Sequence, residues 1–108
     1  MNNKGKRERR KHERHSFGGD IVIDDIFTCT ASDISEEGLY IYMMQPLEKG
    51  RMIRVTIPFK GNKIVVKAQV RSSHPTIGTG IVFIDLTAGQ RGQIKDLIKS
   101  ISKKPPQS

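Results

Sequence analysis

The sequence contains a single cysteine, no tryptophan and no long apolar run. Cys29 cannot form a disulfide within the chain, which suits a reducing compartment, and we expect a cytoplasmic protein. The apolar runs are only a few residues long, too short for a membrane-spanning helix. The basic N-terminus is not followed by the apolar stretch of a secretory signal. These absences together predict a chain that does not insert into a membrane.

Patterns that bind metals or carry out catalysis are also missing. The three histidines are scattered, and neither CxxC nor HExxH occurs, so we expect no zinc site. The acidic residues Asp20, Asp24 and Asp25 lack the regular alternation of a calcium loop, and a solvated turn explains them better. No nucleophile elbow, P-loop or acid pair is present in the sequence. We therefore expect a binding protein without a metal, and not an enzyme.

Acidic residues are the minority, with 11 Asp and Glu against 19 Lys and Arg, which gives a net charge of +8. Residues 1–15 hold seven of the basic residues and two of the acidic ones, a net charge of +5. Such an excess indicates an anionic partner, such as a nucleic acid, a nucleotide or a membrane surface. No apolar residue lies between Asn2 and Ser16, so this segment has nothing to bury and is predicted to be a flexible basic arm.

The middle of the chain alternates apolar and polar residues with period two, which is typical of strands that bury one face. Links rich in Gly, Pro, Asn and Asp separate the alternating segments. The expected strands are a short one at Ile21 and Ile23, followed by 27–32, 39–44, 53–57, 64–71 and 80–84. Six strands with short links predict an antiparallel sheet that curls into a small barrel, because closure removes exposed edges.

The period changes once, near the C-terminus. Four apolar residues fall at i, i+3, i+4 and i+7, on one face of a helix: Ile94, Leu97, Ile98 and Ile101. Thr87 and Gln90 have the spacing of a capping box. We expect a helix over about 88–102 that packs on the barrel or closes one end of it. The sequence thus predicts an arm at 1–8, one domain at 9–102 with its barrel at about 17–85, and a disordered tail at 103–108.

Two short motifs remain. The arm contains RxxxR, from Arg10 to Arg14, directly preceded by Arg9; alone, it is explained better by a solvated basic tail than by a binding site. DxSxxG, formed by Asp33, Ser35 and Gly38, follows the second expected strand. It should occur by chance in only about 3% of chains of this length. A tight turn would also explain it, with the Asp and Ser side chains bonding to local backbone and the glycine at positive φ.

Taken together and in this order, the two motifs resemble those of the PilZ domain, the bacterial receptor for cyclic di-GMP. The resemblance runs from about Glu8 to Ile101 and includes the segment Gly78–Phe83 and the terminal helix. The spacing of 19 residues between Arg14 and Asp33 is short for the family, so we expect a brief first strand. The resemblance implies a mainly β fold, a six-stranded antiparallel barrel of the split-barrel type with a C-terminal helix. It also implies a stand-alone adaptor that binds cyclic di-GMP and alters binding to an unidentified downstream protein.

The resemblance assigns the ligand to both motifs, that is to Arg9, Arg10, Arg14, Asp33, Ser35 and Gly38. The chemistry is suitable, because a guanidinium can clamp a phosphate, bond guanine O6 and N7, or stack on a purine. Asp33 can accept from guanine N1–H and its amino group, Ser35 can donate to a phosphate, and Gly38 can give clearance. We expect the ligand to bridge arm and barrel and to order the arm. In the family, an arginine directly before RxxxR accompanies an intercalated ligand dimer, so two ligand molecules are expected.

Two alternatives remain open. A small basic barrel could bind nucleic acid, but such binders stack bases on aromatic side chains. Here only Tyr40 and Tyr42 share a strand face, which could equally be plain barrel surface. The chain could instead be a ligand-independent scaffold that docks a protein, although such family members usually have eroded motifs. Arg71 and His74 could border the pocket, but they are not assigned to it.

Overall fold

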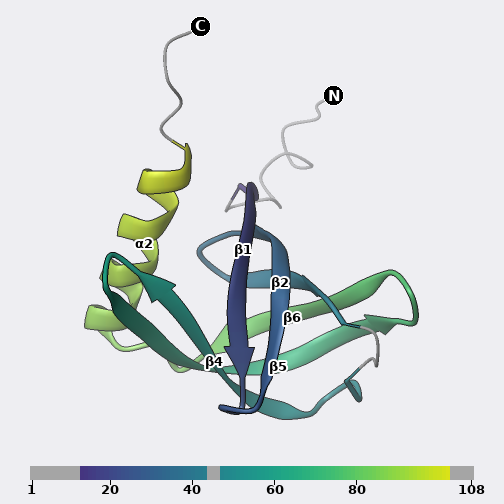
Figure 1. The fold of residues 1–108 in the computed structure, drawn as a ribbon. Coiled ribbons are helices and arrows are strands. Elements are labelled where there is room, and N and C mark those ends of the chain that lie inside the picture. The colour runs from purple at the N-terminus through teal and green to yellow at the C-terminus, as the bar shows by residue number, and fades with distance from the viewer. Residues whose placement is uncertain (1–12, 44–46, 103–108) are drawn as a thin grey trace, which may run out of the picture.

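The chain folds into a closed six-stranded antiparallel barrel with one helix beside it, as shown by a computed structural model (Figure 1). The structure describes residues 13–43 and 47–102. The elements are β1 (His15–Ile23), β2 (Phe27–Ile34), β3 (Gly38–Tyr42), β4 (Met52–Phe59), β5 (Asn62–His74), β6 (Gly78–Ile84) and α2 (Ala88–Ser102). The strands close in the order β1-β2-β3-β6-β5-β4. The predicted fold class is confirmed. The proposed arm at 1–8 and tail at 103–108 lie outside the described residues, and the division of the chain stays a prediction.

The expectation of a brief first strand is wrong, because β1 is nine residues long. Its first half contains Phe17 and two glycines among polar residues, so the period-two pattern shows only in its second half. Gly18 has a φ of 65°, and the pairing with β2 shifts register between Ser16 and Gly19, which marks a β-bulge. Because β1 begins at His15, Arg14 at the end of the RxxxR motif lies directly before a strand that pairs with β2.

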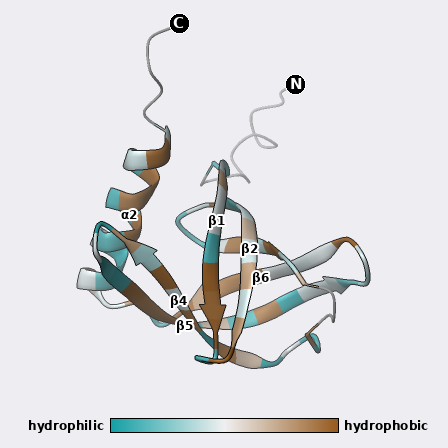
Figure 2. Cartoon of the chain, viewed as in Figure 1, coloured by the Kyte–Doolittle hydropathy of each residue, from teal (hydrophilic) through white to brown (hydrophobic). Residues whose placement is uncertain are grey.

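The apolar residues of the alternating pattern fill the barrel. Buried side chains come from all six strands and include Ile21, Ile34, Leu39, Ile57, Ile64 and Ile81. Figure 2 shows α2 with a hydrophobic side and a hydrophilic side. Three helix residues predicted to face the barrel, Ile94, Leu97 and Ile98, are buried in the same core, and Ile101 is partly buried. The helix packs against β1 and β5, which confirms its predicted role on the barrel.

The predicted capping box fixes where α2 begins. The backbone N–H of Thr87 donates to Gln90 Oε1 at 2.8 Å, and the N–H of Gln90 donates to Thr87 Oγ1 at 3.0 Å. The side-chain amide of Gln90 also donates to the carbonyl of Val65 at 2.9 Å, which ties the first turn of the helix to β5. The position of the next residue, Arg91, is therefore set by hydrogen bonds on two elements.

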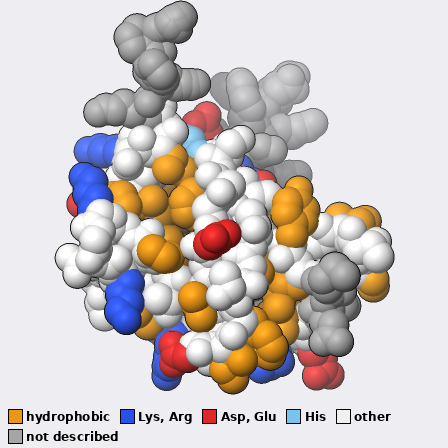
Figure 3. All heavy atoms as spheres, viewed as in Figure 1, with side chains coloured by type: hydrophobic (Ala, Val, Ile, Leu, Met, Phe, Trp, Pro, Cys, Tyr) orange, Lys and Arg blue, Asp and Glu red, His pale blue; other side chains and the backbone are white. Residues whose placement is uncertain are grey.

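Apolar side chains on the described surface are scattered. Six large ones are exposed: Ile26, Phe27, Tyr42, Met52, Val65 and Ile77. They belong to two turns and four different strands, and Figure 3 shows apolar side chains spread among polar and charged ones on the face in view. Single exposed apolar residues are ordinary and mark no docking surface. In the described ranges, no helix has the length and apolarity needed to cross a membrane.

One buried polar group makes a prediction about stability. Thr79 on β6 is 1% exposed, and its Oγ1 has no hydrogen-bond partner among the described residues. An unpaired buried hydroxyl costs about 1–3 kcal/mol. Thr79→Val keeps the branched shape and removes the hydroxyl, so we expect the free energy of unfolding to rise by about 1 kcal/mol in urea titrations followed by circular dichroism. Thr79→Ser keeps the hydroxyl and loses a methyl group, so it should lower stability; the reverse order would contradict this explanation.

Candidate functional site

Two of the predicted site residues, Arg14 and Asp33, meet at the edge of the barrel. Asp33 on β2 lies opposite Ser16 on β1, so Arg14, two residues before Ser16, is its diagonal neighbour. Arg14 Nη1 donates to Asp33 Oδ1 at 2.6 Å. Both side chains are partly exposed, at 51% and 32%. The structure therefore joins the end of RxxxR to the start of DxSxxG.

A β-bulge sets the direction of Asp33. The pairing of β2 with β3 shifts register between Ala31 and Asp33, so Ser32 is an extra residue. Ala31 and Ile34 are both buried, while the two residues between them are partly exposed, which interrupts the period of two. The hydroxyl of Ser32 donates to the carbonyl of Tyr40 at 3.2 Å and holds the bulge. The bulge thus leaves Asp33 at the surface just before the loop that follows.

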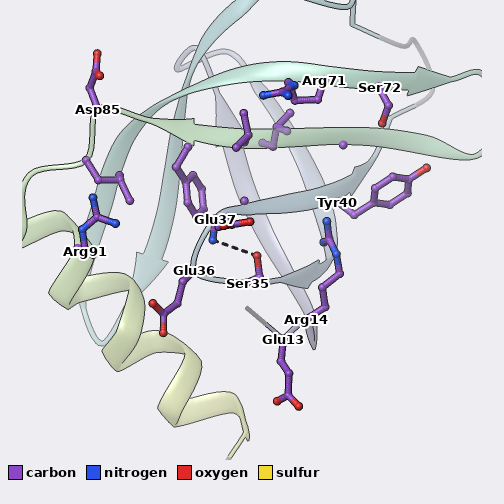
Figure 4. A pocket seen from close by; sticks show the side chains of 16 residues that line it. Glu13, Arg14, Ser35, Glu36, Glu37, Tyr40, Arg71, Ser72, Asp85 and Arg91 are labelled. Atoms are coloured by element: carbon purple, nitrogen blue, oxygen red, sulfur yellow. Dashed lines mark hydrogen bonds between the residues drawn. The ribbon is translucent and has the colours of Figure 1, made fainter. Parts of the chain in front are cut away.

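The loop from Ser35 to Gly38 is fixed by hydrogen bonds to itself and to β6. Ser35 is 4% exposed, and its Oγ accepts from the N–H of Glu37 at 3.1 Å (Figure 4). The N–H of Ser35 donates to the carbonyl of Gly38 at 2.9 Å, and the N–H of Phe83 donates to the carbonyl of Glu37 at 2.8 Å. Because the Ser35 oxygen acts as the acceptor in its bond, the hydroxyl keeps its own hydrogen to donate to a ligand.

The reading of Gly38 as a residue at positive φ is wrong. Positive φ occurs at other described glycines, but Gly38 is not among them. Gly38 pairs with Val82 on β6, and a Cβ added to it would lie 2.0 Å from the carbonyl oxygen of Ile81. The position requires glycine because two strand backbones approach closely there, not because of a left-handed turn. Clearance for a ligand at Gly38 stays a prediction.

A large open pocket, with a cavity volume of about 1340 Å³, lies beside this loop. Its walls are the Ser35–Gly38 loop, parts of β3, β5 and β6, and the start of α2. The volume exceeds the range of about 300–1,000 Å³ that is usual for drug-sized ligands. Seven charged side chains line it, four carboxylates and three arginines: Glu13, Glu36, Glu37, Asp85, Arg14, Arg71 and Arg91. The pocket can hold a ligand as large as a dinucleotide.

Sequence reasoning missed Arg91 and left Tyr40 and Arg71 unassigned, yet all three line the pocket, whereas His74 does not. The ring of Tyr40 lies over β6, since a Cβ on Gly78 would come within 2.5 Å of Tyr40 Cε2. Outward-facing glycines beside an aromatic residue on a neighbouring strand were the available signal for Tyr40. The capping box was the signal for Arg91, because it fixes the residue that follows it. Arg9 and Arg10 lie outside the described residues.

Cys29 is half-buried and packs against the core, in line with its interpretation as a small apolar residue. Burial, with a smaller contribution from the carboxylate of Asp20, raises the pKa of the Cys29 thiol from 9.0 to about 11. The thiol therefore stays protonated at neutral pH and is a poor nucleophile. In the described part of the chain, no group of three or more His, Cys, Asp or Glu residues is placed to hold a metal ion.

Comparison with known proteins identifies the fold. The family model of the PilZ domain matches residues 8–100. No curated protein matches the sequence. Among solved structures, the PilZ domain of CeSA from a cellulose-synthesizing bacterium superposes with a TM-score of 0.71 at 13% identity, covering 84% of this chain and 99% of that one.

Two further structures are similar. The PilZ domain of YcgR from Escherichia coli, solved with c-di-GMP, has a TM-score of 0.69 at 18% identity, over 87% of this chain and 92% of that one. The inhibitor of motility MotI/DgrA from Bacillus subtilis has a TM-score of 0.70 at 19% identity, over 89% of this chain and 53% of that one. Identities this low establish a shared fold, and the family match covers most of the sequence. The chain belongs to the PilZ domain family.

Proposed function

We propose that this protein is a cytoplasmic receptor for cyclic di-GMP that acts by binding and not by catalysis. The observation that carries the proposal is the bond between the two motifs, with Arg14 Nη1 2.6 Å from Asp33 Oδ1. Arg14 lines the pocket, whereas Asp33 does not line it and lies beside Arg14. Ser35, the next residue of DxSxxG, lines the same pocket. The related PilZ domain of YcgR was solved with c-di-GMP, which names the ligand to test.

The geometry gives each residue a chemical task. Asp33 is partly exposed, and its carboxylate can accept from the adjacent N1–H and amino donors of a guanine. Arg14 uses Nη1 for Asp33. A guanidinium has five N–H donors, so Arg14 can hold a phosphate or a Hoogsteen edge while it stays bonded to Asp33. The hydroxyl of Ser35, fixed by the N–H of Glu37, can donate to a phosphate. The pair and the hydroxyl are thus placed before ligand arrives.

The charge of the pocket walls suggests that the arm supplies positive charge to the ligand. Four carboxylates and three arginines line the described pocket, so these walls carry no excess of positive charge. A cyclic dinucleotide carries two negative charges, and two stacked molecules carry four. The arm that precedes Arg14 holds further cations, among them the motif residues Arg9 and Arg10. We therefore propose that the arm supplies them, that ligand bridges arm and barrel, and that the ordered arm changes the binding of a partner protein. Two stacked ligand molecules, as the family resemblance implies, are part of this proposal.

Isothermal titration calorimetry with cyclic di-GMP tests this function directly. We expect binding in the micromolar range or tighter, with two ligand molecules per chain. Arg10→Ala should weaken binding by about tenfold or more, because it removes charge-assisted bonds to phosphate. Lys49→Ala, on an exposed turn outside the pocket, is the matched control and should bind as the unaltered protein does.

A competition experiment with nucleic acid distinguishes a cyclic di-GMP receptor from the main alternative, a nucleic-acid-binding protein. Binding of a random oligonucleotide depends on phosphate contacts and falls steeply with salt. Binding of cyclic di-GMP should persist at moderate salt concentration, because contacts to the bases add to those with the phosphates. Absence of heat on addition of micromolar cyclic di-GMP would refute the proposed function, and tighter binding of the oligonucleotide would favour a nucleic-acid binder.

A further inference from the structure

The arginines of the described residues divide into two groups. Three are ion-paired with aspartates, as Arg14–Asp33 at 2.6 Å, Arg51–Asp24 at 3.1 Å and Arg54–Asp25 at 2.6 Å. The other two, Arg71 and Arg91, have no ion-pair partner within 13–43 and 47–102. Both line the pocket, and both are exposed. The two arginines left without a carboxylate are thus both directed to the same cavity.

Helix stability does not explain Arg91. It lies in the first turn of α2, which contains no acidic residue. A cation at this end of a helix is disfavoured by the helix dipole. The capping box already engages the N–H of Thr87, just before the helix, and the N–H of Gln90 in its first turn. The positive charge of Arg91 therefore does not stabilise the helix. Its position in the first turn places this charge in the wall of the pocket.

Sheet pairing does not explain Arg71 either. In the pairing of β5 with β6, Val70 lies opposite Ile81 and Ser72 lies opposite Gly80, with a register shift between them. Arg71 is therefore the extra residue of a β-bulge. Bulges are found next to functional sites, where they re-aim a side chain. Val70 is buried and Arg71 is exposed, so the bulge places this guanidinium on the pocket side of the barrel surface.

We propose that Arg71 and Arg91 form a second anion-binding pole of the pocket, which we call the β5–α2 pole. Figure 4 shows Arg14 and Arg91 on opposite sides, with Ser35 and Glu37 between them. The two arginines of the β5–α2 pole, one on β5 and one on α2, each take a phosphate or a guanine edge of cyclic dinucleotide that is also held at Arg14 and Asp33. This inference rests on the proposed function and deepens it, since it assigns two ligand-binding residues outside both motifs.

Two consequences follow from the position of the pole. A ligand with one phosphate can reach only one side of the pocket, so the β5–α2 pole selects for a cyclic dinucleotide over a mononucleotide. Arg91 belongs to α2, so ligand bound at the pole connects the helix to the strands that carry Asp33 and Arg71. The selectivity can be measured by comparing cyclic di-GMP with GMP.

The test is calorimetric titration of the full chain and four single variants. Arg71→Ala and Arg91→Ala each remove one of the two guanidinium groups of the β5–α2 pole. Lys67→Ala on β5 and Lys95→Ala on α2 remove the same charge from exposed positions that do not line the pocket. We expect each arginine variant to lower the affinity for cyclic di-GMP by about tenfold or more, or to reduce two bound molecules to one. Both lysine variants should stay within about twofold of the unaltered chain.

The outcomes separate the pole from the proposed function. If both arginine variants bind cyclic di-GMP as the unaltered chain does, while Asp33→Ala loses binding, the pole is refuted and the receptor function stands. If the unaltered chain binds no cyclic di-GMP, the receptor function is refuted. Inorganic pyrophosphate, followed by amide chemical shifts, then decides on the pole: shifts at β5 and α2 that disappear in Arg71→Ala and Arg91→Ala support it, and their absence overturns it.

Discussion

Replacement of Gly38 by alanine is expected to lower the free energy of unfolding by at least about 3 kcal/mol, or to prevent folding. The added Cβ would lie 2.0 Å from the carbonyl oxygen of Ile81 and 3.0 Å from Val82 Cα, all on the backbone of β6. Backbone atoms cannot rotate away as a flexible side chain can, so β3 and β6 would have to separate. Overpacking in a tight interior costs about 1–3 kcal/mol and occasionally more. A strand that joins two neighbours in a closed barrel gives little room for relaxation.

Urea denaturation followed by far-ultraviolet circular dichroism measures this loss. Gly92→Ala is the matched control, because Gly92 lies within α2 and a Cβ there would meet no atom within 4 Å. Alanine is better than glycine inside a helix by about 1 kcal/mol, so the control should gain stability. Equal stability of Gly38→Ala and the unaltered protein would show that the strands separate at little cost and that the glycine serves another purpose.

This expectation changes how the glycine of DxSxxG is interpreted. Loss of ligand binding in a Gly38 variant would follow from a displaced loop, since Phe83 and Glu37 hydrogen-bond just beside it. Ser35 would lose its position with the loop, because its N–H donates to the carbonyl of Gly38 itself. A binding defect at Gly38 therefore says nothing about contact with ligand unless the variant is shown to be folded.

The fold could be predicted because buried residues recur at regular intervals along each strand and along the helix. Strands that bury one face repeat every two residues and the helix repeats at three and four, and both patterns are visible in the sequence. The errors arose where backbone geometry breaks the period. The first half of β1 carries Gly18 at positive φ and a bulge. In the β4–β5 turn, Lys60 has a φ of 52° next to Gly61 at 76°, although side chains such as that of lysine rarely adopt a positive φ. Cross-strand pairing in a closed barrel imposes such conformations on residues that do not prefer them.

The site was predictable only on one side. Arg14 and Asp33 belong to motifs that can be read from the sequence, and the pairing of β1 with β2 brings them together. The opposite side depends on a bulge at Arg71, which has no local signature, and on where α2 docks. The capping box marks where the helix begins, but not which strands it packs against. Register shifts follow from the pairing of whole strands, and helix docking follows from the shape of the core. The residues that complete the pocket are therefore visible only in three dimensions.

Removal of the Asp33 carboxylate is expected to separate binding from stability. Asp33→Ala should lower the affinity for cyclic di-GMP by about 100-fold, because it deletes the acceptor proposed for guanine and releases Arg14. The free energy of unfolding should change by less than about 1 kcal/mol, because exposed ion pairs contribute about 0.2–1 kcal/mol. Both side chains are partly exposed, at 51% for Arg14 and 32% for Asp33. Calorimetry and urea denaturation on the same samples measure the two quantities.

A double-mutant cycle then asks whether the pair acts as one unit. If Asp33 both reads guanine and orients Arg14, the variant with Arg14→Ala and Asp33→Ala should lose little more affinity than the worse single variant. Additive losses would mean that the two residues contact ligand independently and that their 2.6 Å ion pair has no part in binding. Asp96→Asn, an exposed acid of α2 outside the pocket, controls for the change in net charge. Binding by Asp33→Ala equal to that of the unaltered chain would remove Asp33 from the site, because its carboxylate would then serve only to hold Arg14 in the absence of ligand.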